Sequence, residues 1–223
     1  MRVVIAGGHG KIALITAKLL SARGDSVAGF IRNPDHQDDL RGAGAEPIVV
    51  DLENTTNGVV TSHLRGADAV IFAAGAGPGS GVARKETVDR DAAILLADAA
   101  EAAGVPRYVM ISAMGADVNT PDDAADEVFV AYLRAKGAAD DMIRSRTALL
   151  STIVRPGQLT DDPANGKVSI AENTGRGKIP RADVAAVLVA VLDAPDTAGK
   201  TFELISGDTD IEAAIASVAS QAT

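Results

Sequence analysis

The sequence predicts an α/β fold, in which a doubly wound parallel sheet carries helices on both faces and forms three α/β/α layers. Short runs rich in β-branched residues alternate with longer Ala- and Leu-rich stretches at helical spacing. The runs are nearly continuous in apolar residues, which is typical of strands covered on both faces. A glycine also stands between a helical stretch and the next strand at four places, where a left-handed residue can end a helix: Gly24, Gly44, Gly66 and Gly104.

The predicted elements alternate from the first residues up to Val154. The six predicted strands are Arg2–Ala6, Ser26–Ile31, Glu46–Val50, Ala69–Phe72, Arg107–Ile111 and Leu150–Val154. The longer helices between them are expected at Lys11–Ala22, Glu86–Ala103 and Asp126–Arg146, and the shorter ones at Asp35–Arg41 and Thr56–Arg65. Because strands joined by helical crossovers pair in parallel, this order predicts one parallel sheet.

The character of the sequence changes after Val154 into a polar, glycine-rich stretch that runs to Gly177. The remaining expected elements are a helix at Arg181–Asp193, a strand at Thr201–Ile205 and an Ala-rich helix from about Asp210. No linker separates this part from the rest of the chain. We therefore predict a single domain over residues 1–223, in which residues 155–223 form a small substrate-side extension.

The composition excludes several classes of function. The chain has 223 residues, enough for one domain with a core of ordinary size, and 47% of them are hydrophobic but only 3% aromatic. Few rings and a net charge of −9 argue against nucleic acid as a partner. The absence of cysteine excludes disulfides and thiolate metal sites. No apolar stretch is long enough for a bilayer and no signal peptide is evident, so we expect a cytoplasmic protein with no membrane partner.

A glycine-rich turn follows the first predicted strand and precedes the first helix. It reads Gly7-Gly8-His9-Gly10-Lys11-Ile12-Ala13 and fits the G-x-G-x-x-G/A pattern of the Rossmann dinucleotide-binding fold. Glycines allow the sharp turn and the close approach of the backbone to a pyrophosphate, which the helix N-terminus attracts. We expect His9 to contact the pyrophosphate. The turn lacks the Gly-Lys-Ser/Thr ending of a P-loop, which disfavours nucleotide triphosphate hydrolysis.

The residues that follow the second predicted strand indicate which dinucleotide binds. An NAD site usually offers an acidic residue there, whereas Arg32 and Asn33 follow this strand. Arginine pairs bidentately with phosphate, so the sequence favours NADP over NAD, although a solvated arginine is the alternative reading. Asp51 and Leu52 follow the third strand and are expected near the adenine, where Asp51 could equally cap a turn.

Candidate catalytic residues follow the fourth and fifth predicted strands. The glycine-rich loop that begins Ala73-Ala74-Gly75 lies at a ligand-binding sheet edge and is expected to contact cofactor or to be a flexible surface loop. Ser112 ends the fifth strand, and about twenty residues later Tyr132 and Lys136 stand four apart, on one face of a helix. A lysine ammonium beside a phenol favours its ionised form, so Tyr132 could exchange a proton with a substrate oxygen.

Together these motifs resemble the short-chain dehydrogenase/reductase superfamily, and most closely its atypical NAD(P)-binding branch, described as NmrA-like or epimerase-like. The resemblance implies that Ser112 orients the substrate, Tyr132 is the general acid/base, and Lys136 binds the nicotinamide ribose. It also places Pro156 and Gly157, with Gln158 and Leu159 adjoining, against the nicotinamide. This chain departs from the pattern at Ala13, which replaces the third glycine, and at Val88-Asp89-Arg90, where many relatives have a structural Asn.

These observations predict an NADP-preferring oxidoreductase that transfers hydride between the nicotinamide and a small carbonyl/alcohol substrate. Two alternatives stay open: an NAD(P)-binding redox sensor without catalysis, and a flavin- or quinone-type reductase that does not need the tyrosine. Sugar-nucleotide epimerisation is disfavoured because the C-terminal part is short. No metal site is expected, since His9, His36 and His63 lack partners at ligand spacing. The partner is a small-molecule substrate, and the chain is expected to be a monomer or a homodimer.

Overall fold

A computed structural model describes residues 1–77 and 79–220 of the chain. Pro78 of the predicted glycine-rich loop and the last three residues of the predicted domain lie outside the described residues. The elements are β1 (Arg2–Ala6), α1 (Lys11–Ala22), β2 (Ser26–Ile31), η1 (Pro34–His36), α2 (Gln37–Gly42), β3 (Ala45–Val49), α3 (Asn57–Leu64), β4 (Ala69–Phe72), α4 (Val82–Arg84), η2 (Lys85–Asp91), α5 (Ala92–Ala103), β5 (Arg107–Ile111), α6 (Glu127–Arg144), β6 (Leu150–Pro156), β7 (Gln158–Thr160), β8 (Lys167–Ala171), β9 (Lys178–Pro180), α7 (Arg181–Asp193), η3 (Pro195–Thr197), β10 (Thr201–Ser206), β11 (Thr209–Asp210) and α8 (Ile211–Ser220).

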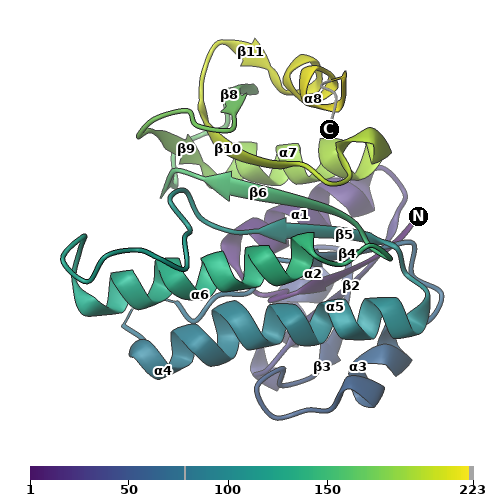
Figure 1. The fold of residues 1–223 in the computed structure, drawn as a ribbon. Helices are drawn as coiled ribbons and strands as arrows, with labels where there is room; N and C mark the ends of the chain where they lie inside the picture. Colours follow the sequence, from purple (N-terminus) through teal and green to yellow (C-terminus); the bar gives the residue numbers. More distant parts are fainter. Residues whose placement is uncertain (78, 221–223) are drawn as a thin grey trace.

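Nine strands of the described chain form one sheet in the order β11-β8-β10-β6-β5-β4-β1-β2-β3 (Figure 1). The seven strands from β10 to β3 pair in parallel, and β8 and β11 add an antiparallel edge. The chain order reverses between β1 and β4, which is the switch point where doubly wound sheets bind ligands beyond the carboxyl ends of their strands. The predicted doubly wound, three-layer α/β fold is confirmed.

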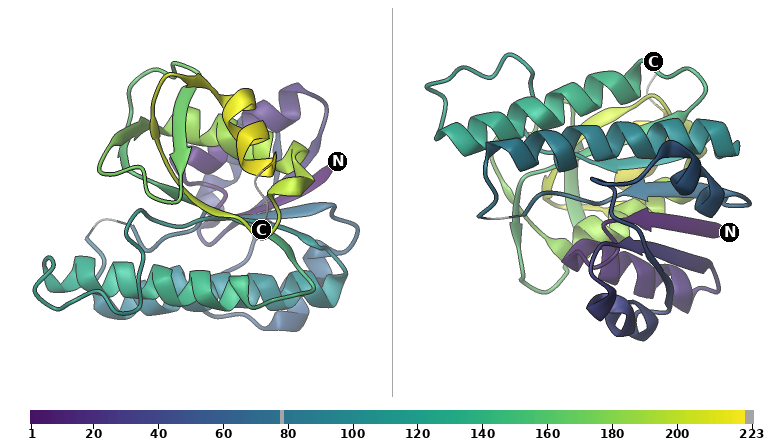
Figure 2. Two further views of the ribbon diagram at one scale, coloured as in Figure 1. Left: turned by 45° about the horizontal axis from the view of Figure 1, so that its top comes forward. Right: turned by 90° about the horizontal axis from the view of Figure 1, so that it is seen from below.

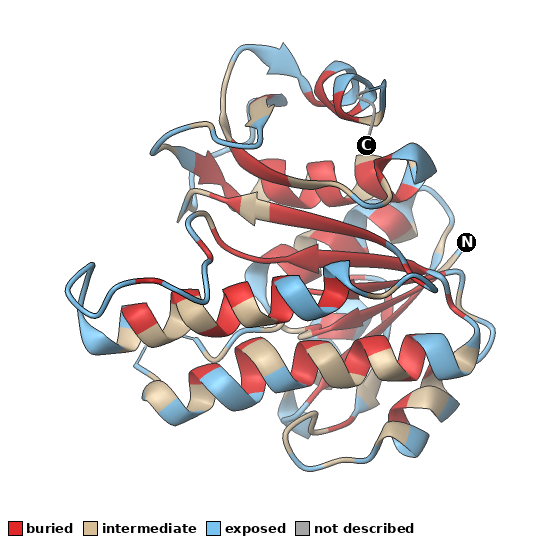
Figure 3. Ribbon diagram, in the orientation of Figure 1, coloured by how far each residue is buried: buried red, intermediate tan, exposed pale blue. Residues whose placement is uncertain are grey.

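Two apolar clusters lie on opposite faces of the sheet. Because side chains alternate along a strand, Val3 and Ile5 of β1 belong to one cluster and Val4 and Ala6 to the other. Helices α1, α7 and α8 cover the first face, and α3, α5 and α6 cover the second (Figure 2). The central strands are almost wholly buried between these layers (Figure 3).

The predicted elements are present, and their bounds differ from the prediction where contacts between distant segments determine them. The four glycines expected to end helices have positive φ, as predicted: Gly24, Gly44, Gly66 and Gly104. The helix predicted at Glu86–Ala103 begins earlier and is a π-helix, η2, before it continues as α5. The polar stretch to Gly177 contains β7 and β8, and β9 begins just after it, which no periodicity indicated. The strand predicted at Glu46–Val50 is β3, shifted by one residue.

The glycine turn is held by close backbone contacts. Gly7 has φ +78°, and a Cβ added there would lie 2.6 Å from the Cα atom of Ala74. A Cβ on Gly8 would lie 2.9 Å from the Cα atom of Gly29 in β2. Any side chain at these two positions would therefore push the turn away from β4 and β2, which fix its place at the sheet edge.

Arg107 ties the start of β5 to its neighbours. Its buried guanidinium donates to the backbone oxygens of Leu150 and Val191, both at 2.7 Å, and to the hydroxyls of Thr152 and Thr197. Among the described residues, no carboxylate pairs with it. Burial lowers the pKa of Arg107 to about 10, still high enough to keep it charged at neutral pH. One side chain thus joins β5, β6 and the end of α7.

We predict that Arg107→Met lowers the free energy of unfolding by about 3 kcal/mol, because it leaves several buried acceptors without a donor. Urea denaturation followed by circular dichroism measures this change. Arg65→Met is the matched control, since Arg65 is exposed at the end of α3, and it should change stability by less than about 0.5 kcal/mol. Equal effects of the two substitutions would contradict this account of Arg107.

Candidate functional site

Two cavities open at the carboxyl edge of the parallel strands, on either side of the end of β4. The first has a volume of ≈ 390 Å³ and the second of ≈ 1560 Å³. Ala73, Ala74 and Gly75 line both cavities. The two spaces therefore meet at the loop after β4, beside the glycine turn.

The glycine turn offers unpaired backbone donors to an anion. Helix α1 begins after Gly10 with no side-chain cap and no acidic residue in its first turn. The first N–H groups of a helix have no partner within the helix, and its dipole favours negative charge there. The turn also has the close packing at Gly7 and Gly8 that a Cβ would prevent. This site fits a pyrophosphate group.

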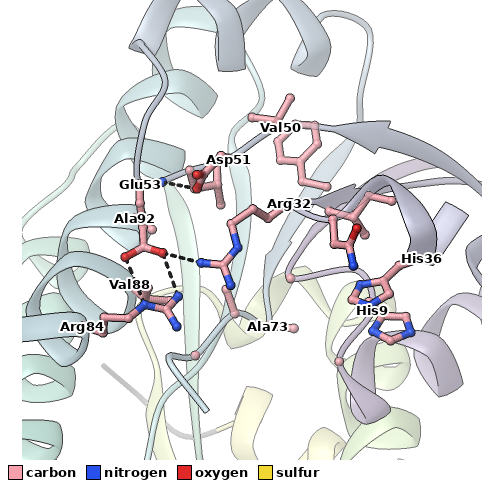
Figure 4. Close-up of a pocket in the computed structure, with 18 residues that line it drawn as sticks. His9, Arg32, His36, Val50, Asp51, Glu53, Ala73, Arg84, Val88 and Ala92 are labelled. Atoms are coloured by element: carbon pink, nitrogen blue, oxygen red, sulfur yellow. Dashed lines mark hydrogen bonds and ion pairs between the residues drawn. The ribbon is translucent and has the colours of Figure 1, made fainter. Parts of the chain in front are cut away.

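Two arginines and one glutamate form the far wall of the first cavity (Figure 4). Glu53 accepts from Arg32 at 2.9 Å and from Arg84 at 2.7 Å, and the Thr87 hydroxyl donates to it at 2.7 Å. The bond from Arg84 holds the pKa of Glu53 below its usual value, with Thr87 and the charge of Arg32 adding to the effect. The carboxylate therefore stays charged and neutralises only one of the two guanidinium groups.

Asp51 lies in the same cavity and is used in a turn. Its carboxylate accepts from the backbone N–H of Glu53 at 3.0 Å and from the Asn54 amide at 2.8 Å. Asn33 has a similar local role, because its side chain accepts from the backbone N–H of Asp35 at 3.0 Å. Of the two readings open for Asp51, the structure shows the turn contact.

Two histidines stack at the other end of the first cavity, as Figure 4 shows. The ring centroids of His9 and His36 are 3.5 Å apart and the rings are inclined by only 13°. The Nε2 atom of His9 lies 2.8 Å from a carboxylate oxygen of Asp39 in α2. The glycine turn and the segment after β2 thus contribute one imidazole each.

The three predicted catalytic residues all line the second cavity. Ser112 follows β5, and its backbone N–H bonds to the Val154 oxygen at 2.8 Å, which fixes the strand end against β6. Tyr132 and Lys136 lie on α6, one turn apart on the same face. A Cβ added at Gly137 would lie 2.6 Å from the backbone of Asp117, so this glycine lets the loop after β5 pack on α6.

Lys136 is buried and held by three elements. Its Nζ atom donates to the Ile111 oxygen at 3.1 Å and lies 3.4 Å from the carboxylate of Asp89 in η2. It also sits 5.3 Å from the centre of the Phe72 ring. Asp89 is fully buried and accepts from the backbone N–H of Ala76 as well. Asp89, in the Val88-Asp89-Arg90 stretch where this chain departs from the predicted pattern, is therefore the counter-ion of Lys136.

The ionisation of Tyr132 is opposite to the expectation. Burial raises the pKa of Tyr132, and the negative charges of Asp89 and Asp140 raise it further. The prediction that Lys136 lowers this pKa is wrong, because burial and the two acids determine its direction, and the Lys136 ammonium is paired with Asp89. A second lysine, Lys85, lies 5.4 Å from the centre of the Tyr132 ring and donates to the Gly77 oxygen. The phenol of Tyr132 is thus protonated at neutral pH.

A second buried carboxylate lies behind Ser112. Asp140 follows Lys136 by one turn of α6 and accepts two bonds of 2.8 Å from the guanidinium of Arg155. Burial raises the pKa of Asp140, while the Ser112 hydroxyl, Arg155 and Lys136 oppose the increase. Two buried carboxylates, Asp89 and Asp140, and two cations, Lys136 and Arg155, therefore support the cavity wall at Ser112.

The opposite wall comes from the segment after β6 and the loop before β9. The backbone N–H of Gln158 bonds to the Gly177 oxygen at 2.9 Å, and β7 pairs with β9. The buried carboxylate of Glu203 accepts from the backbone N–H of Thr174 at 2.9 Å, which anchors the loop. Arg176 of this loop and Lys178, the first residue of β9, line the cavity, are exposed and have no ion-pair partner among the described residues.

Most predicted cofactor-binding residues line one of the two cavities. Those in the first are Gly7, His9, Gly10, Arg32, Asn33, Asp51 and Leu52, together with the shared Ala73, Ala74 and Gly75. Those in the second are Ile12, Lys136, Pro156, Gly157, Gln158 and Leu159. Gly8 and Lys11 line neither: Gly8 packs on β2, and the Lys11 ammonium pairs with Asp161 at 2.6 Å.

Sequence reasoning missed several residues of these walls. Asp140 could have been found, because it continues the Tyr132 and Lys136 face of α6 by one further turn. The contact of Glu53 with Arg84 joins segments 31 residues apart and has no signal in the sequence. In the part of the chain that the structure describes, no group of His, Asp and Glu could hold a metal ion, and no helix is long and apolar enough to cross a membrane.

Comparison with known proteins agrees with this geometry. The sequence pattern of the NAD(P)H-binding family matches residues 7–195. The uncharacterized sugar epimerase YhfK of Bacillus subtilis is 34% identical over 216 residues, which cover 96% of this chain and 99% of the relative. A solved protein of Bacillus halodurans named for NAD-dependent epimerase/dehydratase activity is 34% identical, with a TM-score of 0.88 over 97% of this chain and 99% of that one.

A third similar protein is ChuY of Escherichia coli, an anaerobilin reductase. It is 25% identical, with a TM-score of 0.78 over 94% of this chain and 99% of that chain. The family pattern covers the glycine turn, both cavities and α7, and the identities extend over nearly the whole length of the chain. This protein belongs to the NAD(P)H-binding family, within the atypical branch of the short-chain dehydrogenase/reductase superfamily.

Proposed function

We propose that this protein is an NADP-preferring oxidoreductase that reduces a carbonyl substrate to the alcohol. The observation that carries the proposal is the second cavity, where Ser112, Tyr132 and Lys136 line the same space as the strand-end residues of the first cavity. Because these strand-end residues belong to both cavities, one dinucleotide can reach from the glycine turn to the three polar side chains.

The chain offers a separate group of residues to each part of the cofactor. The N-terminus of α1 would hold the pyrophosphate, and Arg32 with Asn33 would hold the adenosine ribose. Lys136 and the segment 156–159 would hold the nicotinamide half. When bound, the reduced cofactor supplies the hydride.

The raised pKa of Tyr132 supports reduction as the preferred direction. A phenol that keeps its proton at neutral pH can donate it to the oxygen of a carbonyl as that oxygen gains charge. Ser112 would orient the same oxygen by a hydrogen bond. The charge of Lys136 is balanced by Asp89, so we assign Lys136 to binding and to the placement of α6, with less influence on the phenol.

The preference for NADP rests on the guanidinium donors of the first cavity. Arg32 and Arg84 share the carboxylate of Glu53, and the charge of Asp51 also acts on Arg84, so Arg32 is the arginine with donors left for an anionic group. The side chain of Arg32 is 56% exposed and remains accessible from the cavity. Arginine recognises phosphate through paired N–H donors, so this wall suits a ribose 2′-phosphate better than a 2′-hydroxyl.

Sugar epimerisation, which appears in the name of the Bacillus subtilis relative, suits this chain less well. An epimerase of sugar nucleotides needs a substrate domain beyond the dinucleotide-binding unit. Here β8, β10 and β11 join the main sheet, and α7 and α8 cover one of its faces. Few residues of the C-terminal part are left to enclose a second nucleotide.

A second candidate is a reductase of planar anionic acceptors, in which Tyr132 is dispensable. Two of the six aromatic rings of Phe and Tyr in the chain lie together on the cavity wall: Phe129 and Tyr132 have centroids 5.8 Å apart, and Phe129 is 47% exposed. Arg176 and Lys178 line the same cavity and pair with no acid among the described residues. A cavity that offers both an exposed ring and such cations suits a flat molecule with an acidic group.

For carbonyl reduction we predict that Tyr132→Phe lowers kcat by roughly 100-fold to 10,000-fold, because the proton donor is removed, with NADPH affinity nearly unchanged. Activity of the wild type should not fall between pH 7 and 9, since the raised pKa keeps the phenol protonated there. Steady-state assays over a panel of carbonyls, quinones and flavins measure both.

The other tyrosine gives a matched control. Tyr108 lies in β5 and donates to the Ala93 oxygen at 2.9 Å, so Tyr108→Phe should affect stability but keep turnover. Full activity in Tyr132→Phe would refute the acid role and favour the planar-acceptor reaction. Tight cofactor binding without turnover of any substrate would favour the sensor.

We predict that wild-type protein binds NADPH more tightly than NADH, and that Arg32→Ala weakens NADPH binding by about tenfold or more. NADH binding should change little, because the lost contact is to the 2′-phosphate. Fluorescence titration of the reduced nicotinamide measures both affinities, and Arg65→Ala controls for the general loss of one positive charge. Tighter binding of NADH by the wild type would refute the preference.

For the planar-acceptor reaction we predict a higher kcat/KM for FMN than for riboflavin, which has the same ring system without the phosphate. Arg176→Gln and Lys178→Gln together should reduce this ratio by about tenfold, since each charge-assisted contact contributes to binding. Arg144→Gln, on the far end of α6, serves as control. An equal preference in wild type and variant would exclude this role of the loop.

A further inference from the structure

The stacked pair of His9 and His36 has no role in the function proposed above. The two rings come from the glycine turn and from η1, and they meet at 3.5 Å within the first cavity. Both side chains are partly exposed to the cavity. Among the described residues, Asp39 accepts from or pairs with His9, whereas the ring nitrogens of His36 have no hydrogen-bond partner.

The charged groups around the pair come from several elements. Asp39 of α2 contacts His9, and Asp35 and Asp38 are exposed on the same short segment as His36, with Arg41 held by Asp38. The cavity adds four charged residues that lie beyond the end of β2, beyond β3 or on α4: Arg32, Asp51, Glu53 and Arg84. Of these, Arg32 is nearest to η1 in the chain, and it pairs with Glu53.

Stacking restricts how much positive charge the two imidazoles can carry together. Two positive rings in face-to-face contact repel each other, so the free protein disfavours charge on both. A doubly negative phosphate removes this restriction, because it attracts each ring and accepts its N–H. Histidine is the side chain that changes charge near physiological pH, so the pair can take up a proton when such an anion arrives.

We infer that His9 and His36 form a binding site for the ribose 2′-phosphate and take up a proton when it binds. The ligand is a phosphomonoester, and the inference rests on the NADP preference proposed above. The site lies with Arg32 and Asn33 after β2, where dinucleotide folds recognise this part of the ribose. The pyrophosphate, which we expected His9 to contact, has the N-terminus of α1 instead.

Proton uptake determines the direction in which NADPH affinity changes with pH. When binding takes up a proton, affinity increases as the pH falls. NADPH affinity should therefore rise from pH 8.0 to pH 6.5, whereas NADH affinity should stay constant. The ratio of the two affinities is expected to grow by roughly fivefold to tenfold over this interval.

The experiment is isothermal titration calorimetry with 2′,5′-ADP and with 5′-AMP, which differ only in the 2′-phosphate. Titrations in buffers of different ionisation enthalpy give the number of protons taken up. We expect uptake with 2′,5′-ADP and none with 5′-AMP in the wild type. His36→Asn should lose most of this uptake and bind 2′,5′-ADP about tenfold more weakly at pH 6.5, with 5′-AMP unaffected.

His63→Asn is the matched control, since His63 packs its edge on Phe30 and lines neither cavity. Retained 5′-AMP binding shows that the His36→Asn protein is folded, and any proton release in this variant reports the titration of the phosphate itself. Equal uptake in wild type and His36→Asn would overturn the inference but leave the NADP preference intact. Equal affinity of the wild type for 2′,5′-ADP and 5′-AMP at every pH would overturn both.

Discussion

The geometry of the second cavity depends on the burial of the Lys136 charge. An ammonium that has left water needs a counter-ion and acceptors, and Lys136 finds them on three other elements, at Asp89, the Ile111 oxygen and the Phe72 ring. The pair fixes α6 against η2 and against the ends of β4 and β5. The same contacts place Tyr132 and Ser112 on one wall. If either charge were removed, the other would remain buried without its counter-ion.

The electrostatics of the two cavities are opposite to those of the whole molecule. The chain carries a net charge of −9, yet Arg176 and Lys178, which pair with no described acid, and the arginine wall of Arg32 and Arg84 lie around the ligand spaces. Acids inside the cavities are each committed to a donor, as Glu53 is to the arginines and Glu203 to Thr174. This distribution attracts anionic dinucleotides to the sheet edge while the remaining surface repels other polyanions.

The sequence was sufficient where local rules act. Alternation of strands and helices, the turn from Gly7 to Ala13 and the four helix-ending glycines follow from side-chain pattern and backbone freedom, and the structure confirms them. It was insufficient where distant segments meet. Strands β7 and β9 exist because Gln158 reaches Gly177, and the direction of the Tyr132 pKa is set by burial and by acids on η2 and α6. A spacing of four residues placed Lys136 near the tyrosine but could not show that Asp89 holds it.

The π-helix η2 determines the direction in which the preceding side chains of that helix point. Its wider turns hold one more residue than an α-turn, and through them Arg84 and Val88 line the first cavity while Lys85 and Asp89 line the second. Winding the same seven residues, Lys85–Asp91, as an α-helix would rotate the preceding side chains by roughly 100° about the axis, because each residue turns further in an α-helix than in a π-helix. The number of residues in this segment therefore determines which side chains line each cavity as much as their types do. Homologous chains that keep these cavity walls should keep the number of residues between the end of β4 and α5.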